Sequence, residues 1–447
     1  MKRIQTMSTV MLLTAALSIA FAAASPSADR TIPILSQKER AELQNRWLSV
    51  RFAQVLPALM RREKVDMWVV ICREHNEDPM YGTLVPYPSM FAWRTSMFVY
   101  HMKDTGLECL SISPDGRGVL HKEFPAFYQP AWARETPDPW QRLAQVIKER
   151  NPKTIAINQS REFAFADGLS AENKARLVEA LGPDLAARLV SSERLAVGWL
   201  ETRSPEELEF YPRIVALTHQ LVREVFSRHV ITPGVTTLDD LTWWIRERLA
   251  DMKLTTWFQP LFYIIRPGSS DPAKSRVICP GDLLRCDIGV TYMGLCSDVQ
   301  ETAYVLREGE SDAPRGLRDA FARGNRLQDI LAGEFKEGRT GNEILAAALK
   351  KAGSEGLGAV IYSHPVGYNG HGTGPRIGLS DMQDGVPGIG DYPLHLNTVY
   401  AIELGVQAKI PEWNDMSFHM ALEEDGAFTS RGVTFLDGRQ TRIILVK

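Results

Sequence analysis

The sequence predicts an α+β protein of two domains, a smaller α/β domain followed by a larger domain with two similar halves. The chain has 447 residues, more than a single hydrophobic core usually serves. In the first part, apolar runs of strand length alternate with helical segments, which is typical of an α/β domain. In the second part, the order helix, helix, strand pair occurs twice, which predicts related halves whose strand pairs face each other.

The composition is that of an ordinary globular protein, with 44% hydrophobic and 23% charged residues. The formal net charge is −3, which argues against a general affinity for nucleic acid or anionic membranes. Five cysteines are present, an odd number whose spacing matches neither a disulfide framework nor a zinc site. We therefore expect the cysteines to be small core residues and not ligands.

The N-terminus has the pattern of a signal peptide. Lys2 and Arg3 precede the apolar residues 10–21, and the alanines at 22–24 form a small-residue cleavage site. The apolar stretch is short for a membrane span, which needs about 20 residues. We therefore expect cleavage near Ala24, a periplasmic or secreted protein, and no stable membrane insertion afterwards. A retained membrane anchor is the alternative.

We expect the first domain to span residues 25–200. It opens with an amphipathic helix within residues 33–62, where Leu48, Val55 and Leu59 are among the apolar positions. Apolar runs and helical stretches then alternate up to about Leu200. The expected strands are residues 65–71, 97–101, 107–113 and 154–158, and the expected helices are residues 140–150 and 171–181.

The second domain, residues 201–447, begins with a helix whose start is well marked. Ser204 and Glu207 form a capping box, and Pro205 occupies the first helical position. This pattern predicts a helix from 205 to about 228, and Thr237 opens the next one.

The same order follows in the second half of this domain. Residues 317–335 are expected to be helical. Thr340 and Glu343 form a further capping box, and Gly353 is a plausible stop for the helix that follows it.

The first acidic pair, Asp287 and Asp298, lies in the first strand pair. If Tyr292 and Met293 are the two loop residues, the two aspartates are directly opposite, with Cβ atoms about 4.5–5.5 Å apart. A shift of one residue pairs Asp287 with Gln300 and leaves Asp298 on the same face. Without a cation these carboxylates would repel, and one would hold a proton. Their apolar neighbours argue against a solvated edge hairpin.

The second acidic pair is Glu403 and Glu423. Glu403 interrupts the apolar run of residues 399–406, and a buried carboxylate is costly unless it is paired or bound to a metal. Glu423 is followed by Glu424 and Asp425, so a surface acidic cluster is the alternative there.

A glycine-rich segment between the two strand pairs carries His364 and His371. Glycines on both sides of His371 let the backbone approach a crowded site closely. Oxygen ligands with one imidazole suit manganese, cobalt, iron or zinc. The ordinary alternative is a histidine that serves as a satisfied polar residue.

Together these motifs resemble the pita-bread metallopeptidases, which include Xaa-Pro aminopeptidase, prolidase and methionine aminopeptidase, with creatinase as a metal-free relative. The resemblance implies a pita-bread (creatinase/aminopeptidase-like) catalytic domain, preceded by a creatinase-like N-terminal α/β domain. It covers nearly the whole chain after the signal peptide. The matching motifs are residues 202–208, 231–236, 281–289, 294–298, 401–403 and 422–425.

The resemblance also implies a centre of two divalent metal ions (manganese, cobalt or zinc). Asp287 would hold one ion, Asp298 and Glu423 would bridge both, and His371 and Glu403 would complete the other. A bridging hydroxide would attack the scissile carbonyl. Glu403 would shuttle the proton to the leaving amine, and His364 would contact the substrate or the tetrahedral intermediate.

The sequence departs from this family at three places. In the methionine aminopeptidase register His371 is the ligand, whereas in the Xaa-Pro register the ligand position falls on Pro375; a similar shift would put Ser417 in place of Glu423. We prefer the register that fills both sites. The family's second histidine falls on Gly378. The substrate-side histidine expected before the first aspartate motif is absent, and residues 266–275 occupy that stretch.

The leading interpretation is a dinuclear metallopeptidase of the aminopeptidase or dipeptidase type. It would cleave a peptide or peptide-like amide bond, with Xaa-Pro peptides and dipeptides as candidate substrates. The alternative is a degenerate, metal-free peptide-binding protein of the same fold, as among histone-chaperone relatives. Metal-free amidine hydrolysis, as in creatinase, is disfavoured because four unpaired buried carboxylates would destabilise the fold. The family often forms dimers, so a homodimer is a further expectation.

Overall fold

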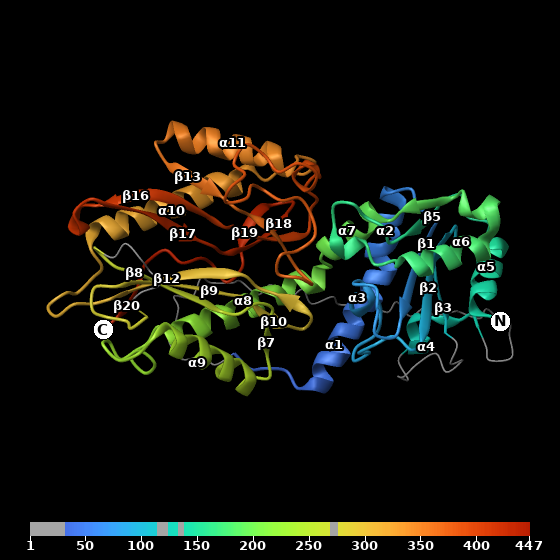
Figure 1. Ribbon diagram of the computed structural model, residues 1–447, viewed down its shortest axis with the longest axis horizontal. Helices are drawn as coiled ribbons and strands as arrows, with labels where there is room; N and C mark the ends of the chain where they lie inside the picture. Colours follow the sequence, from blue (N-terminus) through green and yellow to red (C-terminus); the bar gives the residue numbers. More distant parts are fainter. Residues whose placement is uncertain (1–31, 114–123, 133–137, 269–275) are drawn as a thin grey trace, which may run out of the picture. The chain divides into compact units, whose positions relative to one another are not determined.

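The computed structural model describes residues 32–113, 124–132, 138–268 and 276–447 (Figure 1). The chain divides into two compact units, Met1–Pro33 and Ile34–Lys447, and the description below concerns the second. The predicted signal peptide lies outside the described residues. Within the described ranges, no helix has both the length and the apolar character that crossing a bilayer requires.

Six strands form the sheet of the first part: β1 (Met67–Arg73), β2 (Thr95–Lys103), β3 (Gly106–Ile112), β4 (Gln129–Pro130), β5 (Ile155–Ile157) and β6 (Leu189–Ser191). Their order in the sheet is β4-β3-β2-β1-β5-β6. The side chains of β1 alternate between two hydrophobic clusters, with Trp68 and Val70 in one and Val69 and Ile71 in the other. A strand that is buried on both faces needs cover on both faces of its sheet. The strands predicted from the apolar runs are confirmed.

Helices supply that cover. One cluster contains side chains of α1 (Gln37–Val50), η1 (Arg51–Val55), α2 (Leu56–Arg62) and α7 (Glu193–Glu201), and the other those of α5 (Pro139–Arg150) and α6 (Ala171–Ala186). The helix predicted within residues 33–62 is therefore three consecutive segments. Its middle segment is a π-helical turn that ends at Val55, two residues before Pro57, a residue that lacks the N–H of a regular helix. Shorter segments are α3 (Tyr81–Leu84), α4 (Phe124–Phe127) and η2 (Ala164–Ala166).

The capping boxes of the second part are confirmed. Ser204 and Glu207 cap α8 (Pro205–Val225), and α9 (Leu238–Asp251) starts after Thr237. The next helices are α10 (Arg315–Glu334) and α11 (Gly341–Ser354), the latter capped by Thr340 and Glu343. Gly353, the predicted stop, lies inside α11.

The strands of the second part form four small sheets, ordered β11-β10-β7, β20-β12-β9-β8, β13-β16-β17 and β14-β15-β18-β19. They comprise β7 (Thr255–Thr256), β8 (Leu261–Ile265), β9 (Leu283–Ile288), β10 (Val290–Tyr292), β11 (Leu295–Cys296), β12 (Val299–Val305), β13 (Gly358–Ile361), β14 (His364–Val366), β15 (Thr398–Ala401), β16 (Leu404–Ile410), β17 (Met416–Leu422), β18 (Asp425–Thr429), β19 (Gly432–Phe435) and β20 (Ile444–Val446). Short helical turns are η3 (Ile389–Asp391) and η4 (Pro411–Trp413).

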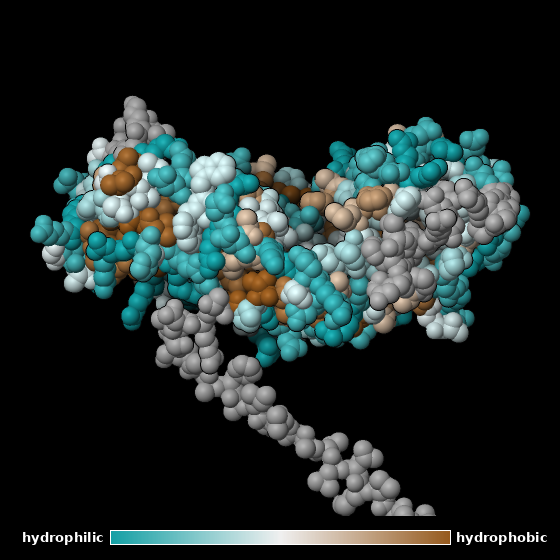
Figure 2. All heavy atoms as spheres, turned by 90° about the horizontal axis from the view of Figure 1, so that it is seen from below, coloured by the Kyte–Doolittle hydropathy of each residue, from teal (hydrophilic) through white to brown (hydrophobic). Residues whose placement is uncertain are grey.

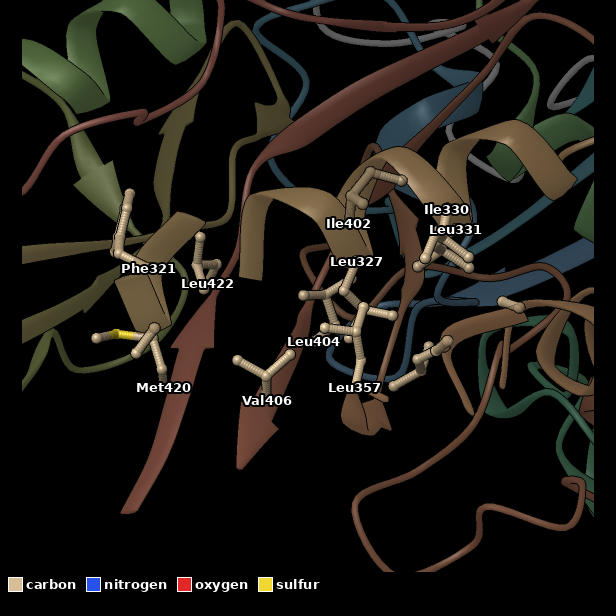
Figure 3. Packing of buried hydrophobic residues seen from close by; sticks show 14 of the residues in the cluster. Phe321, Leu327, Ile330, Leu331, Leu357, Ile402, Leu404, Val406, Met420 and Leu422 are labelled. Carbon is tan, nitrogen blue, oxygen red and sulfur yellow. The ribbon is translucent and has the colours of Figure 1, made fainter. Parts of the chain in front are cut away.

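One hydrophobic core lies between α10 and the strand pair β16–β17. Figure 3 shows Phe321, Leu327 and Leu331 of α10 near side chains of the two strands, Leu404 and Leu422 among them. Side chains alternate along a strand. When one residue of β16 or β17 faces this core, the residues next to it in sequence face the opposite side. The core therefore fixes the direction in which the adjacent carboxylates point.

The turn of the first strand pair differs by one residue from the first of the two predicted registers. Its loop residues are Met293 and Gly294, both with positive φ (60° and 74°), as a two-residue hairpin turn requires. The pairing therefore places Asp287 opposite Gln300, which is the shifted register considered above.

The face of the molecule in Figure 2 is largely hydrophilic, with hydrophobic patches between the polar areas. Large hydrophobic residues with high exposure include Met90 (87%), Val235 (69%) and Trp243 (62%). Exposed apolar residues of this kind are common on folded proteins.

A buried ion pair joins the start of α8 to η1. Arg51 Nη1 donates to Glu207 Oε2 at 2.8 Å, and the same oxygen accepts from Ser204 N at 2.6 Å. Burial alone would raise the pKa of Glu207, but the charges of Arg51 and Arg203 lower it below 4.5. Glu207 is therefore ionised in the folded protein.

We predict that Glu207→Gln lowers the free energy of unfolding by about 3–5 kcal/mol at pH 7, because it leaves buried arginines without their carboxylate. The folded pKa is depressed, so this stabilisation is present above about pH 4.5 and is lost as the pH falls through the folded pKa. Urea unfolding at pH 7 and pH 4 measures both effects. Glu206→Gln, at the exposed neighbouring position, is the matched control; an equal loss in both variants would contradict the prediction.

Candidate metal centre

The two acidic strand pairs meet edge to edge at their acidic residues. Gln300, in the second position of β12, forms a bridge with Glu423, which directly follows β17, and the Gln300 N–H donates to the Glu423 carbonyl at 3.0 Å. Asp298 directly precedes β12. Glu403 lies between β15 and β16, and the pairing of Leu404 with Leu422 continues to place it beside Glu423.

The four predicted carboxylates therefore lie together. One ligand atom from each of Asp287, Asp298 and Glu423 falls within 4.8 Å of the others, and the same holds for His364, Glu403 and Glu423. Asp298 and Glu423 are buried, and Asp287 and Glu403 are partly buried. The two overlapping groups share Glu423, and such sharing is what two neighbouring cations would need.

The imidazole nearest to these carboxylates is that of His364 on β14. Its Nε2 lies 3.5 Å from Asp298 Oδ2, 3.8 Å from Glu403 Oε2 and 3.8 Å from Glu423 Oε1. Its Nδ1 lies 3.1 Å from the carbonyl oxygen of Pro365 and donates to it. Burial, together with the charges of Arg376 and His371, lowers the pKa of His364 well below its usual range.

His371 lies further out, on the glycine-rich loop, and is exposed. Its Nε2 is 3.4 Å from Tyr362 Oη, and its ring centroid lies 4.6 Å from that of His364 and 5.1 Å from that of Trp257. One of its nitrogens also falls within 4.8 Å of ligand atoms of Asp298 and His364. Both histidines are therefore at the centre, at different depths.

The carboxylates of the centre are hard to ionise together. Burial is the largest cause, and the charges of the neighbouring acids add to it in three of the four. The pKa of Asp287 is raised to about 6 and that of Glu403 to about 8. Those of Asp298 and Glu423 are raised well above their usual range. A divalent cation would reverse these shifts because it favours the ionised form of each ligand.

Gln300 is a residue of the centre that the motif analysis did not assign. Its Nε2 donates to Glu403 Oε1 at 2.9 Å and to Glu423 Oε2 at 2.8 Å. Gln300 follows Asp298 by two residues at the start of β12, and alternation along the extended chain places both on one face. This spacing is the signal that could have identified it. The amide holds one oxygen of each glutamate and leaves the other oxygen free.

The acidic run after β17 is buried, so the alternative of a surface cluster is wrong. Glu424 Oε2 lies 3.0 Å from His219 Nε2, and Asp425 Oδ2 accepts from the Asp298 N–H at 2.9 Å. The second ring nitrogen of His219 lies 3.0 Å from Asp437. Each acid of the run thus has its own environment, and Glu423 is the one that belongs to the metal-capable groups at the centre. No local sequence pattern pointed to His219, which lies within α8.

The residues present fit a divalent metal. Within the described part of the chain, buried atoms without a hydrogen-bond partner include His364 Nε2, Glu423 Oε1 and Gln300 Oε1. Carboxylate oxygens with an imidazole nitrogen are the donor set of manganese, cobalt, iron and zinc. The five cysteines are free, as expected, and the metal-capable groups of the described residues contain none of them.

Two of the positions at which the sequence departs from the family, Pro375 and Gly378, offer no side-chain ligand. Pro375 is buried, and its carbonyl accepts from Tyr400 Oη at 3.3 Å. Gly378 has a φ of 75°, and a Cβ there would lie 2.3 Å from the Ile361 carbonyl oxygen. A histidine at 378 would therefore require the backbone to move.

Comparison with known proteins agrees with this arrangement. Residues 211–435 match the model of metallopeptidase family M24. The uncharacterized peptidase YqhT of Bacillus subtilis (strain 168) is 26% identical over 219 residues, which are 46% of this chain and 54% of that protein. The chain thus spans about half the length of this curated relative.

Several solved structures share the fold. An X-Pro aminopeptidase from Thermotoga maritima MSB8 is 17% identical with a TM-score of 0.63, over 87% of this chain and 100% of its own. A Xaa-Pro dipeptidase from Bacillus anthracis is 17% identical with a TM-score of 0.58, over 92% of this chain and 100% of its own. The N-terminal domain of the FACT complex subunit SPT16 from Cicer arietinum (chickpea) is 12% identical with a TM-score of 0.55, over 92% of this chain and 99% of its own. At these identities the likeness establishes the fold, a pita-bread catalytic domain preceded by an α/β domain.

We predict that His219→Gln destabilises the protein by about 3–5 kcal/mol at pH 7, because it removes the cation that Glu424 and Asp437 share. Burial alone would lower the pKa of His219, but hydrogen bonds to Asp437 and Glu424 raise it to about 10. A raised folded pKa means that the stabilisation is complete below about pH 6.5 and is lost as the pH rises through about 10. The difference in the free energy of unfolding between wild type and variant, measured by urea unfolding, should therefore become smaller between pH 8 and pH 10.5.

His229→Gln, at an exposed position, is the control for that experiment. If the difference in the free energy of unfolding between wild type and His219→Gln stays constant up to pH 10.5, the imidazole of His219 is neutral and the prediction is wrong.

Proposed function

Because the chain belongs to metallopeptidase family M24, we propose that it is a hydrolase that cleaves a peptide or peptide-like amide bond with the help of two divalent cations. Manganese, cobalt and zinc are the candidate metals. One observation carries the proposal: the lone pair of a buried imidazole nitrogen faces oxygens of three carboxylates at 3.5–3.8 Å. These atoms repel one another unless a cation or a proton lies between them.

The ligands in this proposal are Asp287, Asp298, Glu403 and Glu423 with one imidazole. Cations bound there would polarise a carbonyl oxygen and lower the pKa of water. The chain itself supplies proton transfer at Glu403. Its carboxylate is partly buried at the edge of the centre, where it can reach both a bound cation and the leaving group.

The surroundings of the centre suit a short peptide with an apolar side chain. Trp257 and Tyr362 are partly buried and lie beside His371, so they offer aromatic surface to a substrate group such as a proline ring. The names of the structural neighbours include an X-Pro aminopeptidase and a Xaa-Pro dipeptidase. We therefore propose an aminopeptidase or dipeptidase, with Xaa-Pro peptides as the first substrates to test.

A metal-free binding protein of the same fold is the second candidate. Gln300 favours it, because its amide already bridges Glu403 and Glu423 with two hydrogen bonds. In that case the centre would hold a peptide or another partner without cleaving it. The two candidates differ in whether the protein retains metal.

Residues 1–24 have the pattern of a cleaved signal peptide, so we propose a periplasmic or secreted location. A domain boundary near residue 200 is proposed as well, because the six-stranded sheet ends at Ser191 and α8 begins at Pro205. We also propose a homodimer, because members of the resembling family often form dimers.

Metal stoichiometry tests the proposed function directly. The mature protein is loaded with manganese, cobalt or zinc, desalted, and analysed by mass spectrometry. We expect about two ions per chain, followed by hydrolysis of Xaa-Pro peptides or dipeptides in the loaded protein only. Failure to retain any of the three metals would contradict the hydrolase and support the binding protein.

We predict that Asp298→Asn removes both ions and reduces activity to the background rate, because this carboxylate is shared by the two ions. Asp239→Asn, at an exposed position in the first turn of α9, should leave metal content and activity unchanged. In the metal-free state Asp298→Asn should be at least as stable as wild type, because one of several repelling buried carboxylates is gone. Wild-type turnover in Asp298→Asn would exclude the assignment.

A further inference from the structure

We infer that Arg285 of β9, together with Tyr263 and His419, forms a binding site for an anionic group of the substrate close to the bond that is cleaved. The group is a carboxylate, which is either the C-terminus of a short peptide or an acidic side chain. This inference rests on the proposed function, and it narrows the class of peptide that the centre would accept.

The guanidinium of Arg285 is half-buried and has no acidic partner. Within the described part of the chain, no carboxylate forms an ion pair with it, and its Nε is buried without a hydrogen-bond partner. Its Cζ lies 4.3 Å from the centroid of the Tyr263 ring. Stacking on an aromatic ring holds a guanidinium in place and leaves its N–H groups free to donate in their own plane. Because a buried donor without an acceptor is costly, this arginine is suited to a ligand oxygen.

Strand pairing places this arginine beside the centre. Arg285 precedes Asp287 by two residues, so their side chains lie on the same face of β9. Tyr263 is directly opposite Arg285 on β8. Two residues of a strand span about 7 Å, which is about the length of two residues of an extended peptide. A carboxylate bound to Arg285 would therefore belong to the C-terminus of a short peptide or to a residue next to the scissile bond.

His419 completes the site from β17. It precedes Glu423 by four residues and lies on the same face of the strand pair. A Cβ at Gly405 would collide with His419 Nε2, and Gly405 is two residues nearer to Glu403 than the position that pairs with His419. The ring thus extends along β16 toward the centre. Burial lowers the pKa of His419, and the charge of Arg285 lowers it further, so a neutral imidazole able to donate or accept a hydrogen bond lies beside the guanidinium.

The charge of Arg285 is not needed to balance the acids once metal is bound. The four carboxylates of the proposed ligand set neutralise two divalent cations, so the arginines near the centre are then in excess and attract an anion. Arg376, a second arginine whose charge acts on Glu403, already donates to Tyr362 Oη at 3.2 Å. Arg285 has no such acceptor, and a guanidinium binds a carboxylate through two parallel hydrogen bonds.

Pairs of peptides that differ in one charge test the inference. Ala-Pro and Ala-Pro amide differ at the C-terminus. Ala-Glu amide and Ala-Gln amide differ in the side chain after the bond, and Glu-Pro amide and Gln-Pro amide in the side chain before it. KM and kcat are measured with the manganese-loaded protein, and calorimetry measures binding where no hydrolysis occurs. We expect wild type to favour the anionic member of at least one pair by about 10- to 100-fold, and the pair that responds identifies the source of the carboxylate.

Arg285→Gln should abolish this preference by raising KM for the anionic peptide, while kcat, the KM of the neutral peptide and the metal content stay as in wild type. Arg285→Lys should keep part of the preference, because the charge remains and the planar fork is lost. If the glutamine variant fails to fold, this reduced preference is the readout. Arg431→Gln, at an exposed position in the turn between β18 and β19, is the control.

The outcomes separate the inference from the proposed function. Equal affinity of wild type for both members of every pair overturns the inference, as does a preference that survives in Arg285→Gln. Loss of metal in Arg285→Gln also overturns it, because the arginine would then act through the ligands. Hydrolysis without any preference for charge leaves the proposed function in place. Absence of both metal and hydrolysis overturns the proposed function, whereas a calorimetric preference that depends on Arg285 would still support the anion site.

Discussion

Burial of negative charge is the constraint on which the second part of this molecule depends. Asp298 and Glu423 are buried beside Asp287 and Glu403, and within the described residues the groups that contact these carboxylates include the imidazole of His364 and the amide of Gln300. The charges of Arg285 and Arg376 lower the pKa of acids at the centre, but burial outweighs them. Buried carboxylates remain unfavourable unless they are protonated or bound to a cation. The hydrogen bonds of Gln300 reduce the repulsion between the two glutamates but add no charge.

On the opposite face of the same strands, a positive charge within the protein compensates the buried acids. Glu301 and Glu424 are the neighbours in sequence of Gln300 and Glu423, and they point away from the centre toward His219. A protonated imidazole supplies the positive charge there. Among the described residues, a protonated imidazole is hydrogen-bonded to an acid on one face of the ribbon, whereas Arg285 and Arg376 act on acids of the centre through their charge only. Because alternate residues face opposite sides, the His219 side fixes which acids are left for the centre.

Much of this arrangement could be predicted from the sequence. Asp287 and Glu403 interrupt apolar runs, and the capping boxes at Ser204 and Thr340 mark helix starts by local rules. These features depend on neighbours in sequence, so a pattern can reveal them. The position of Asp298 also followed, since both registers considered for its strand pair placed it on the same face as Asp287.

The remaining features depend on contacts between distant segments. His219 lies 205 residues from Glu424, and the bridge from Gln300 to Glu423 joins two separate strand pairs. The relative depth of His364 and His371 depends on the pairing of β14 with β15. No local pattern determines any of these.

In the proposed metal-bound protein, the bridge between Gln300 and Glu423 would make the centre a chelator of two parts. One half of the domain contributes the two aspartates, and the other contributes both glutamates and the histidines, so neither half alone holds a full set of donors. Joining the halves converts weak, separate interactions into one intramolecular site, as a tether does for two binding modules. Affinity for the proposed ion would then report how rigidly the two halves are held together, and a substitution far from the ligands would weaken it by loosening that contact.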